Sequence, residues 1–145
     1  MPERETLERA REDAREGKSP STQAGEFIRE EIHHVREGKH GARSPQQAIA
    51  IGLSKARRAG VKLGPPKKGS ASIQKKAEQD TQAGKRARSS QGKPSATRSR
   101  AVEGALKREP HRTASREALS RQTKRSAAQR GKASRQQAAR TRKAA

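Results

Sequence analysis

Adjacent pairs of basic residues recur along the second half of this chain of 145 residues and carry its clearest chemistry. An ammonium group attracts a phosphate oxygen as a point charge, and a guanidinium can bind two phosphate oxygens at once. Each pair could therefore neutralise phosphates of a polyanion and release its condensed counterions. The candidate nucleic-acid-binding residues are Lys67, Lys68, Lys75, Lys76, Lys85, Arg86, Lys107, Arg108, Lys124, Arg125, Arg142 and Lys143.

The net charge of +21 is concentrated in the second half of the chain. Residues 1–64 contain 13 Lys or Arg and 10 Asp or Glu, whereas residues 65–145 contain 23 and 5. Such a polycation attracts polyanions, so DNA is the expected partner and RNA the alternative. No membrane partner is expected, because no amphipathic stretch has a large aromatic or Leu-rich face. Phosphate contacts carry no sequence information, so we expect binding without sequence preference.

The composition predicts a mostly disordered chain with α-helical segments and no strands. Only 27% of the residues are hydrophobic, and Phe27 is the single aromatic residue. Ordering one residue costs about 1–2 kcal/mol of backbone entropy, and large apolar side chains offset this at about 25 cal/mol per Å² buried. Pro65 and Pro66 disfavour helix and mark a boundary. We therefore expect residues 65–145 to form a basic, low-complexity, disordered tail.

The first half contains three expected helical segments. Residues 1–18 hold a charged, marginal helix, and residues 19–64 are expected to form a small helical hairpin. Ser19 and Ser44 are candidate N-caps, each followed by proline at the first helical position. The hairpin is expected to be only marginally stable at this size. Its expected core consists of Phe27, Ile28, Ile32, Val35, Ile49, Leu53, Val61 and Leu63.

Histidines and glutamates form the one constellation that resembles a metal site: His33, His34 and His40 with Glu30, Glu31 and Glu37. The pairs Glu30/His34 and His33/Glu37 have i,i+4 spacing, but the two pairs project about 100° apart on a helix. We therefore expect no metal site and no cofactor. We also expect no enzymatic activity, because no nucleophile, base and orienting group are held rigidly together.

Three runs of sequence resemble a known family. They read Ser-Pro-Ser-Thr-Gln-Ala-Gly-Glu-Phe-Ile-Arg-Glu-Glu from Ser19, Arg-Glu-Gly-Lys-His-Gly-Ala-Arg-Ser from Arg36, and Gln-Ala-Ile-Ala-Ile-Gly-Leu-Ser-Lys-Ala-Arg-Arg-Ala-Gly-Val-Lys from Gln47. Residues 19–69 thus resemble a family of small, basic, bacterial proteins of uncharacterised function. The C-terminal tail is similar in composition to the Lys/Ala-rich arms of linker-histone-like bacterial proteins. The resemblance implies a bacterial, cytoplasmic origin and DNA binding, and it brings no catalytic residues.

Together these features predict a histone-like or nucleoid-associated protein that binds DNA through its C-terminal tail. Residues 20–63 would then supply self-association or bind a protein partner. Three alternatives remain: a basic protein associated with RNA or the ribosome, a helical protein-interaction module whose basic tail only localises it, and an internal structural protein of a virus or particle.

Overall fold

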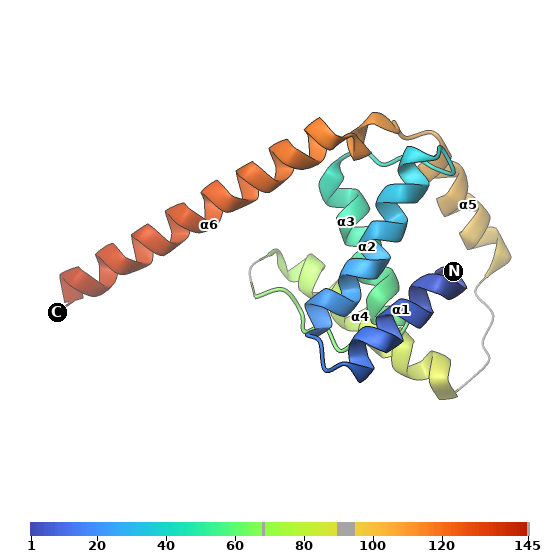
Figure 1. The fold of residues 1–145 in the computed structure, drawn as a ribbon, viewed down its shortest axis with the longest axis horizontal. Helices are drawn as coiled ribbons and strands as arrows, with labels where there is room; N and C mark the ends of the chain where they lie inside the picture. Colours follow the sequence, from blue (N-terminus) through green and yellow to red (C-terminus); the bar gives the residue numbers. More distant parts are fainter. Residues whose placement is uncertain (68, 90–94, 145) are drawn as a thin grey trace.

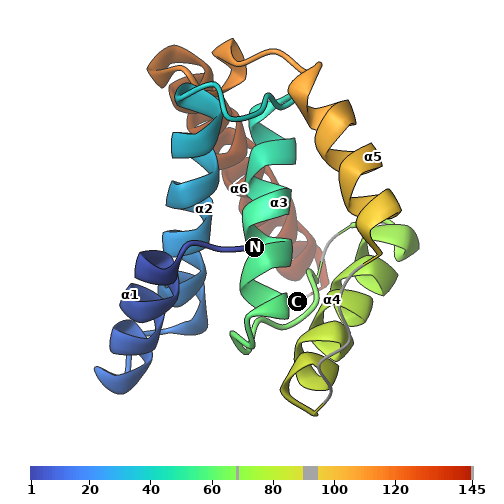
Figure 2. The ribbon, with the colours of Figure 1, turned by 90° about the vertical axis from the view of Figure 1, so that its right-hand side faces the viewer.

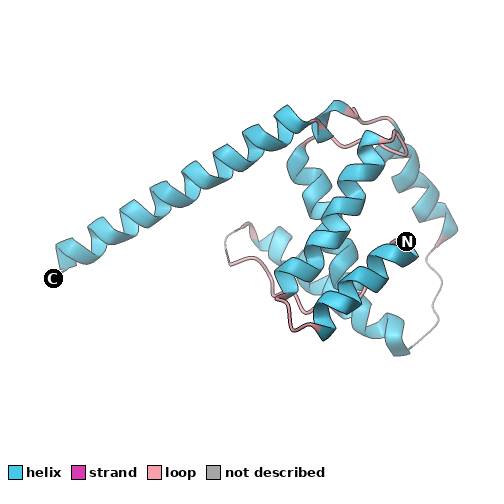
Figure 3. Ribbon diagram, in the orientation of Figure 1, coloured by secondary structure: helices cyan, strands magenta, loops and turns pink. Residues whose placement is uncertain are grey.

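Helices account for the regular structure in the residues that the computed structural model describes, which are 1–67, 69–89 and 95–144. Figure 1 shows their course, and no strand occurs within these residues (Figure 3). The helices are α1 (Arg4–Arg15), α2 (Pro20–Arg36), α3 (Pro45–Arg58), α4 (Ala71–Ser89), α5 (Ala96–Lys107) and α6 (Arg116–Ala144), with a short 3-10 turn, η1 (Arg112–Ala114), before α6. The predicted helical, strand-free character is confirmed for the described residues.

Local sequence signals set the ends of the hairpin helices. The Ser19 hydroxyl accepts a hydrogen bond from the N–H of Thr22 at 3.3 Å and caps α2. The Ser44 hydroxyl caps α3 in the same way, accepting from the N–H of Gln47 at 3.2 Å. Gly38 follows α2 with a φ of 75°, a left-handed conformation that ends the helix and that glycine adopts without strain. Both predicted N-caps are therefore confirmed.

The core is assembled around α3, which lies between α2 and α4 (Figure 2). One cluster joins Phe27, at 1% exposure, to Val61 and to small residues that include Ala10 of α1. A second cluster surrounds the fully buried Val35. Phe27 is therefore a core residue rather than a surface for stacking bases.

The expectation of a mostly disordered chain is wrong, because the described residues are largely helical and α4 packs against α3. Ala77 of α4 is buried, and so is Asp80, whose side chain is 3% exposed. The Asp80 carboxylate accepts hydrogen bonds from Ser54 at 2.7 Å and from Arg58 at 2.9 Å, both on α3. A small apolar contact and a paired charge thus replace the large apolar side chains that this segment lacks.

The end of α5 and the chain that follows it are attached to the turn between α2 and α3. The N–H of Gly41 donates to the carbonyl of Leu106 at 2.9 Å, and the N–H of Ala42 donates to the carbonyl of Pro110 at 3.1 Å. Ala114 is 1% exposed and belongs to the cluster around Val35. From this anchor α6 extends away from the other helices (Figure 1).

The disorder expectation failed because it counted only large apolar side chains. Alanines fill the contacts at helix crossings, and they also have the highest helix propensity. Contacts cross positions 18 and 64, since α1 packs on α2 and α4 packs on α3. None of the described helices combines the length and the apolar character that crossing a bilayer demands.

At the crossing of α2 and α3, the addition of a single methyl group is expected to lower the stability of the protein. A Cβ at Gly52 would lie 2.8 Å from the Cα of Ile28, whereas a Cβ at Gly25 would meet nothing within 4 Å. We expect Gly52→Ala to destabilise the protein by about 1–3 kcal/mol through overpacking. Gly25→Ala, the control on α2, should be neutral or stabilising by about 1 kcal/mol. Urea unfolding followed by circular dichroism measures both, and equal stability of the two variants would contradict this crossing.

The docking of α4 predicts a pH-dependent contribution from Asp80. Burial acts to raise the pKa of the Asp80 carboxyl, but hydrogen bonds from Ser54, Arg58 and Lys76 outweigh burial and lower it below its ordinary value of 3.8. The stabilisation by ionised Asp80 is therefore complete above that value and is lost as the pH falls through the lower folded pKa.

We accordingly expect Asp80→Asn to cost about 1–3 kcal/mol at neutral pH. The difference from the wild type should shrink in acid. Glu78→Gln removes the same charge from an exposed position of α4 and serves as the control. Thermal unfolding over a pH series checks the prediction, which fails if both substitutions have the same small effect at pH 7.

Candidate nucleic-acid interface and a second polar cluster

α6 begins at a well-formed N-terminal cap. The N–H of Ala118 donates to the Ser115 hydroxyl at 3.2 Å. Glu117 lies in the first turn, where a hydrogen bond from its own backbone N–H and another from Ser115 lower the pKa of its carboxyl. A carboxylate at this end also complements the helix dipole. The cap and the acidic first turn start the helix, and no proline interrupts it up to Ala144.

One face of α6 is turned toward the helical bundle. Leu119, Gln122 and Ser126 are half-buried and recur at helical spacing. The Gln122 side chain accepts a hydrogen bond from the Gln46 amide of α3 at 2.6 Å. The segment directly before α6 is held as well, since the Arg36 guanidinium donates a hydrogen bond to the carbonyl of Ala114 at 2.8 Å. These contacts fix which side of α6 is free.

The opposite face carries a set of basic side chains that we call the α6 basic stripe. At about 100° per residue, they fall within an arc of roughly 100° that is centred about 140° from the bundle-facing side chains. All of them are exposed, and within the described residues no carboxylate lies at ion-pair distance from any of them. The stripe consists of Arg121, Lys124, Arg125, Lys132 and Arg135.

The stripe is long as well as narrow. Arg121 and Lys132 are separated by 11 residues, as are Lys124 and Arg135, and 11 residues make about three turns of helix. At about 1.5 Å per residue, the rise from Arg121 to Arg135 is roughly 21 Å. α6 as a whole contains ten Lys or Arg and one Glu. The helix therefore presents a nearly one-signed row of charges.

The sequence prediction identified part of this stripe. Lys124 and Arg125 belong to it, but Arg121, Lys132 and Arg135 were missed because only adjacent basic pairs were sought. Once the segment is treated as a helix, the 11-residue recurrence in the sequence identifies four of the five residues, and Arg125 lies on the same face one residue after Lys124.

The other predicted binding residues lie elsewhere on the molecule. Lys76 is paired with Asp80 at 3.2 Å and Lys107 with Glu103 at 2.8 Å, so both are partly neutralised. In the described residues neither α4 nor α5 packs against α6. The remaining positions are as follows: Lys67 is exposed before α4; Lys75, Lys85 and Arg86 are exposed on α4; Arg108 is exposed directly after α5; Lys68 lies outside the described residues; and Arg142 and Lys143 lie in α6, where only the backbone is described.

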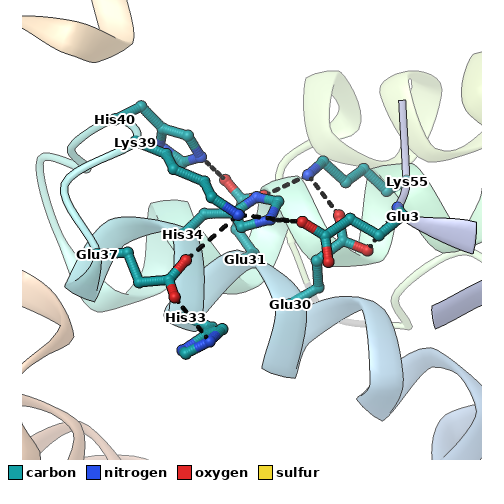
Figure 4. Close-up of polar contacts among 9 residues, drawn as sticks. All are labelled: Glu3, Glu30, Glu31, His33, His34, Glu37, Lys39, His40 and Lys55. Atoms are coloured by element: carbon teal, nitrogen blue, oxygen red, sulfur yellow. Dashed lines mark hydrogen bonds and ion pairs between the residues drawn. The ribbon is translucent and has the colours of Figure 1, made fainter. Parts of the chain in front are cut away.

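A second polar cluster gathers most of the histidines and acids of α2 near the N-terminus and the α2–α3 turn. Figure 4 shows its members converging from α2, from the turn, from α3 and from the start of the chain. Only one of the two predicted i,i+4 pairs forms, because His33 contacts Glu37 at 3.0 Å while His34 bonds to Glu3 at 2.8 Å instead of Glu30. The cluster consists of Glu3, Glu30, Glu31, His33, His34, Glu37, Lys39, His40 and Lys55.

Two carboxylates of this cluster, those of Glu3 and Glu30, are stabilised in their charged form. The hydrogen bond with His34, followed by that from Lys39, lowers the pKa of Glu3 to about 2, and the hydrogen bond with Glu3 raises the pKa of Lys39. Burial acts to raise the pKa of Glu30, but hydrogen bonds from Thr6 and from the N–H of Glu3, together with the Lys55 charge, lower it. The cluster thus stabilises negative charge on Glu3 and Glu30 in a strongly basic protein.

Comparison with known proteins places one region of the chain. No curated protein and no solved structure matches the chain. A protein-family model does match part of the chain. The matching part contains α2, the turn, α3 and the connection after α3, and it does not include α4, α5 or α6. It overlaps the segment from 19 to 69 that sequence analysis related to an uncharacterised family, so that part of the resemblance is confirmed. Residues 15–68 match DUF6496, a family of unknown function.

Proposed function

We propose that this protein binds double-stranded DNA without sequence preference through the α6 basic stripe. One observation carries the proposal: five exposed cations lie on the face of a projecting helix that is turned away from the bundle, without a carboxylate at ion-pair distance among the described residues. Glu117, one turn before Arg121, is the single acid of α6 and interacts with the charge of Arg121. The stripe still carries a large excess of positive charge on an accessible rod, which a polyanion can neutralise.

Phosphate neutralisation supplies the binding energy in this mechanism. Each Lys or Arg of the stripe that contacts a phosphate releases a condensed counterion. A stripe of roughly 21 Å matches the axial rise of about six base pairs, given about 3.4 Å per phosphate of one strand along the duplex axis. Because the cations are carried by a helix, less conformational entropy is lost on binding than from a disordered arm.

The side-chain inventory favours a duplex over single strands. Proteins that bind single-stranded nucleic acid stack successive bases on aromatic side chains. The only aromatic residue of the chain, Phe27, is buried in the core. The major groove of B-form DNA is about 12 Å wide and admits an α-helix, whereas the A-form groove of RNA is deep and narrow. DNA is therefore the proposed ligand, and RNA is the competitor in the test.

The remainder of the chain fits a histone-like role. The bundle holds the root of α6 and would set the direction in which the DNA-bound helix points. A bacterial protein of this kind would be found in the cytoplasm, associated with the nucleoid. No base contact is part of the proposal, so no preferred sequence is expected.

The proposal predicts a specific loss in a stripe variant. Arg121→Gln, Lys132→Gln and Arg135→Gln together remove about three phosphate contacts, so the slope of log K against log salt should become shallower by about 2.7. The control, Arg11→Gln, Arg15→Gln and Lys62→Gln, removes the same charge from exposed positions outside α6 and should change the slope by less than about 1.

Fluorescence anisotropy with a duplex of about 20 base pairs, between about 50 and 200 mM salt, measures both slopes. Equal slopes for the two variants would contradict binding through the stripe, and a flat salt dependence of the wild type would contradict phosphate binding altogether. Tighter binding to an RNA duplex than to DNA of the same length would overturn the choice of DNA.

A further inference from the structure

Three potential metal ligands converge inside the second polar cluster. Glu31 and His34 lie one turn apart on α2, and the turn that follows α2 brings His40 back toward them (Figure 4). One ligand atom from each residue lies within 4.8 Å of the other two. The three side chains are largely withdrawn from solvent, with exposures of 0% for Glu31, 11% for His34 and 15% for His40.

The Glu31 carboxylate is the least satisfied group among them. Both of its oxygens are buried, and neither accepts a hydrogen bond of acceptable geometry in the described residues. Lys55 Nζ lies 2.7 Å from Oε2 and His40 Nε2 lies 3.2 Å from Oε1, so charge proximity rather than directed hydrogen bonding surrounds this carboxylate. Buried carboxylate oxygens normally accept hydrogen bonds. Because Glu31 Oε1 accepts none in the described residues, it is available to a cation.

The His40 ring is oriented as a metal ligand. Its Nδ1 lies 3.1 Å from the backbone carbonyl of Gly41, which can only accept, so the ring must donate from Nδ1. In the neutral ring Nε2 then carries a lone pair and faces the Glu31 oxygen, so two acceptors oppose each other at 3.2 Å. A cation between them removes this conflict, and a backbone carbonyl on the other ring nitrogen is the usual second partner of a ligating histidine.

The His34 ring is held by a carboxylate. Its Nε2 bonds to Glu3 Oε1 at 2.8 Å. When Nε2–H donates to that carboxylate, the neutral ring retains its lone pair on Nδ1, which is then the nitrogen that a metal would have to use. A carboxylate that orients a histidine in this way is a common feature around zinc ions and raises the basicity of the ligand.

The net negative charge of the cluster also favours the binding of a divalent cation. It contains four carboxylates, from Glu3, Glu30, Glu31 and Glu37, against two ammonium groups, from Lys39 and Lys55. With neutral histidines the net charge is −2, in a protein whose total charge is +21. One divalent ion brings the cluster to neutrality.

We propose that Glu31, His34 and His40 bind one divalent transition-metal ion, and that Zn²⁺ fits this donor set best. Two imidazole nitrogens and one carboxylate oxygen are a recognised zinc set that leaves a fourth position for water. Zinc bonds of about 2.0–2.1 Å hold tetrahedral ligand atoms about 3.4 Å apart, so the ligands must close by up to about 1.4 Å. Rotation of the His34 and His40 side chains would have to supply this movement, while Lys55 stays on Glu31 Oε2 and Glu30.

The site has a structural role in this proposal. It joins α2 to the turn that contains Gly41 and Ala42, and the same two residues hold the chain at Leu106 and Pro110. A bound ion would therefore strengthen the anchor from which α6 extends. Small domains with a limited apolar core commonly gain stability from such a metal. The inference does not depend on the proposed DNA binding.

Zinc titration of the full-length protein tests the proposal. After treatment with a chelator, the protein should bind one Zn²⁺ per chain in competition with a chromophoric indicator. A hundredfold excess of zinc over Kd should raise the Tm by about 5–10 °C. Binding of Co²⁺ should give the visible absorption of a tetrahedral site with nitrogen ligands.

Two variants and a matched control locate the ion. His40→Gln should weaken zinc binding at least tenfold and abolish the rise in Tm, and His34→Gln should do the same. His33→Gln replaces the neighbouring histidine of α2, which is 66% exposed, and should bind like the wild type. Circular dichroism confirms the fold of each metal-free variant. Absence of stoichiometric binding by the wild type would overturn the proposal, and so would equal weakening by His33→Gln and His40→Gln.

Discussion

Backbone hydrogen bonds from the α2–α3 turn to the end of α5 and the chain that follows it connect the two halves of this protein. The N–H groups of Gly41 and Ala42 would otherwise be unsatisfied at the end of a hairpin, and they find carbonyl partners some 65 residues further along the chain. A Cβ at Gly41 would lie 1.8 Å from the carbonyl oxygen of Glu109. Only glycine permits this approach, so Gly41 is required for the close contact between the turn and the chain that leads into α6.

Small residues also make up most of the interior of the described helices. The buried hydrophobic residues are mostly alanines, with Phe27, Val35 and Val61 as the larger members. Small side chains allow helices to approach closely, as Gly52 does against Ile28, but they bury little apolar area. Buried ionised groups such as Asp80 and Glu30 then make contacts that larger hydrophobic residues make in other bundles. Such groups are favourable only while paired, so the fold depends on specific partners more than on apolar volume.

Sequence reasoning succeeded where the signal was local and failed where it was not. The N-caps at Ser19 and Ser44, the glycine at 38 and the apolar spacing of the hairpin are encoded within a few residues of each other. The docking of α4 is not, because Asp80 finds Ser54 and Arg58 through the fold and not through any spacing in the sequence. The convergence of Glu31, His34 and His40 was missed for a similar reason: His40 lies beyond the helix, where helical periodicity says nothing about position.

The correction from a disordered tail to helices changes what the positive charge can do. Cations on a disordered arm adjust to any array of phosphates, and each ordered residue costs about 1–2 kcal/mol of entropy. Cations fixed on one face of α6 keep their spacing, so in the proposed complex the affinity would depend on how well that spacing matches a phosphate backbone. Gln122 and Leu119 hold the opposite side of α6 against the bundle. These contacts fix the direction in which the basic stripe faces. The N-terminal half therefore contributes to the basic surface by orienting it, although it carries little of the excess charge.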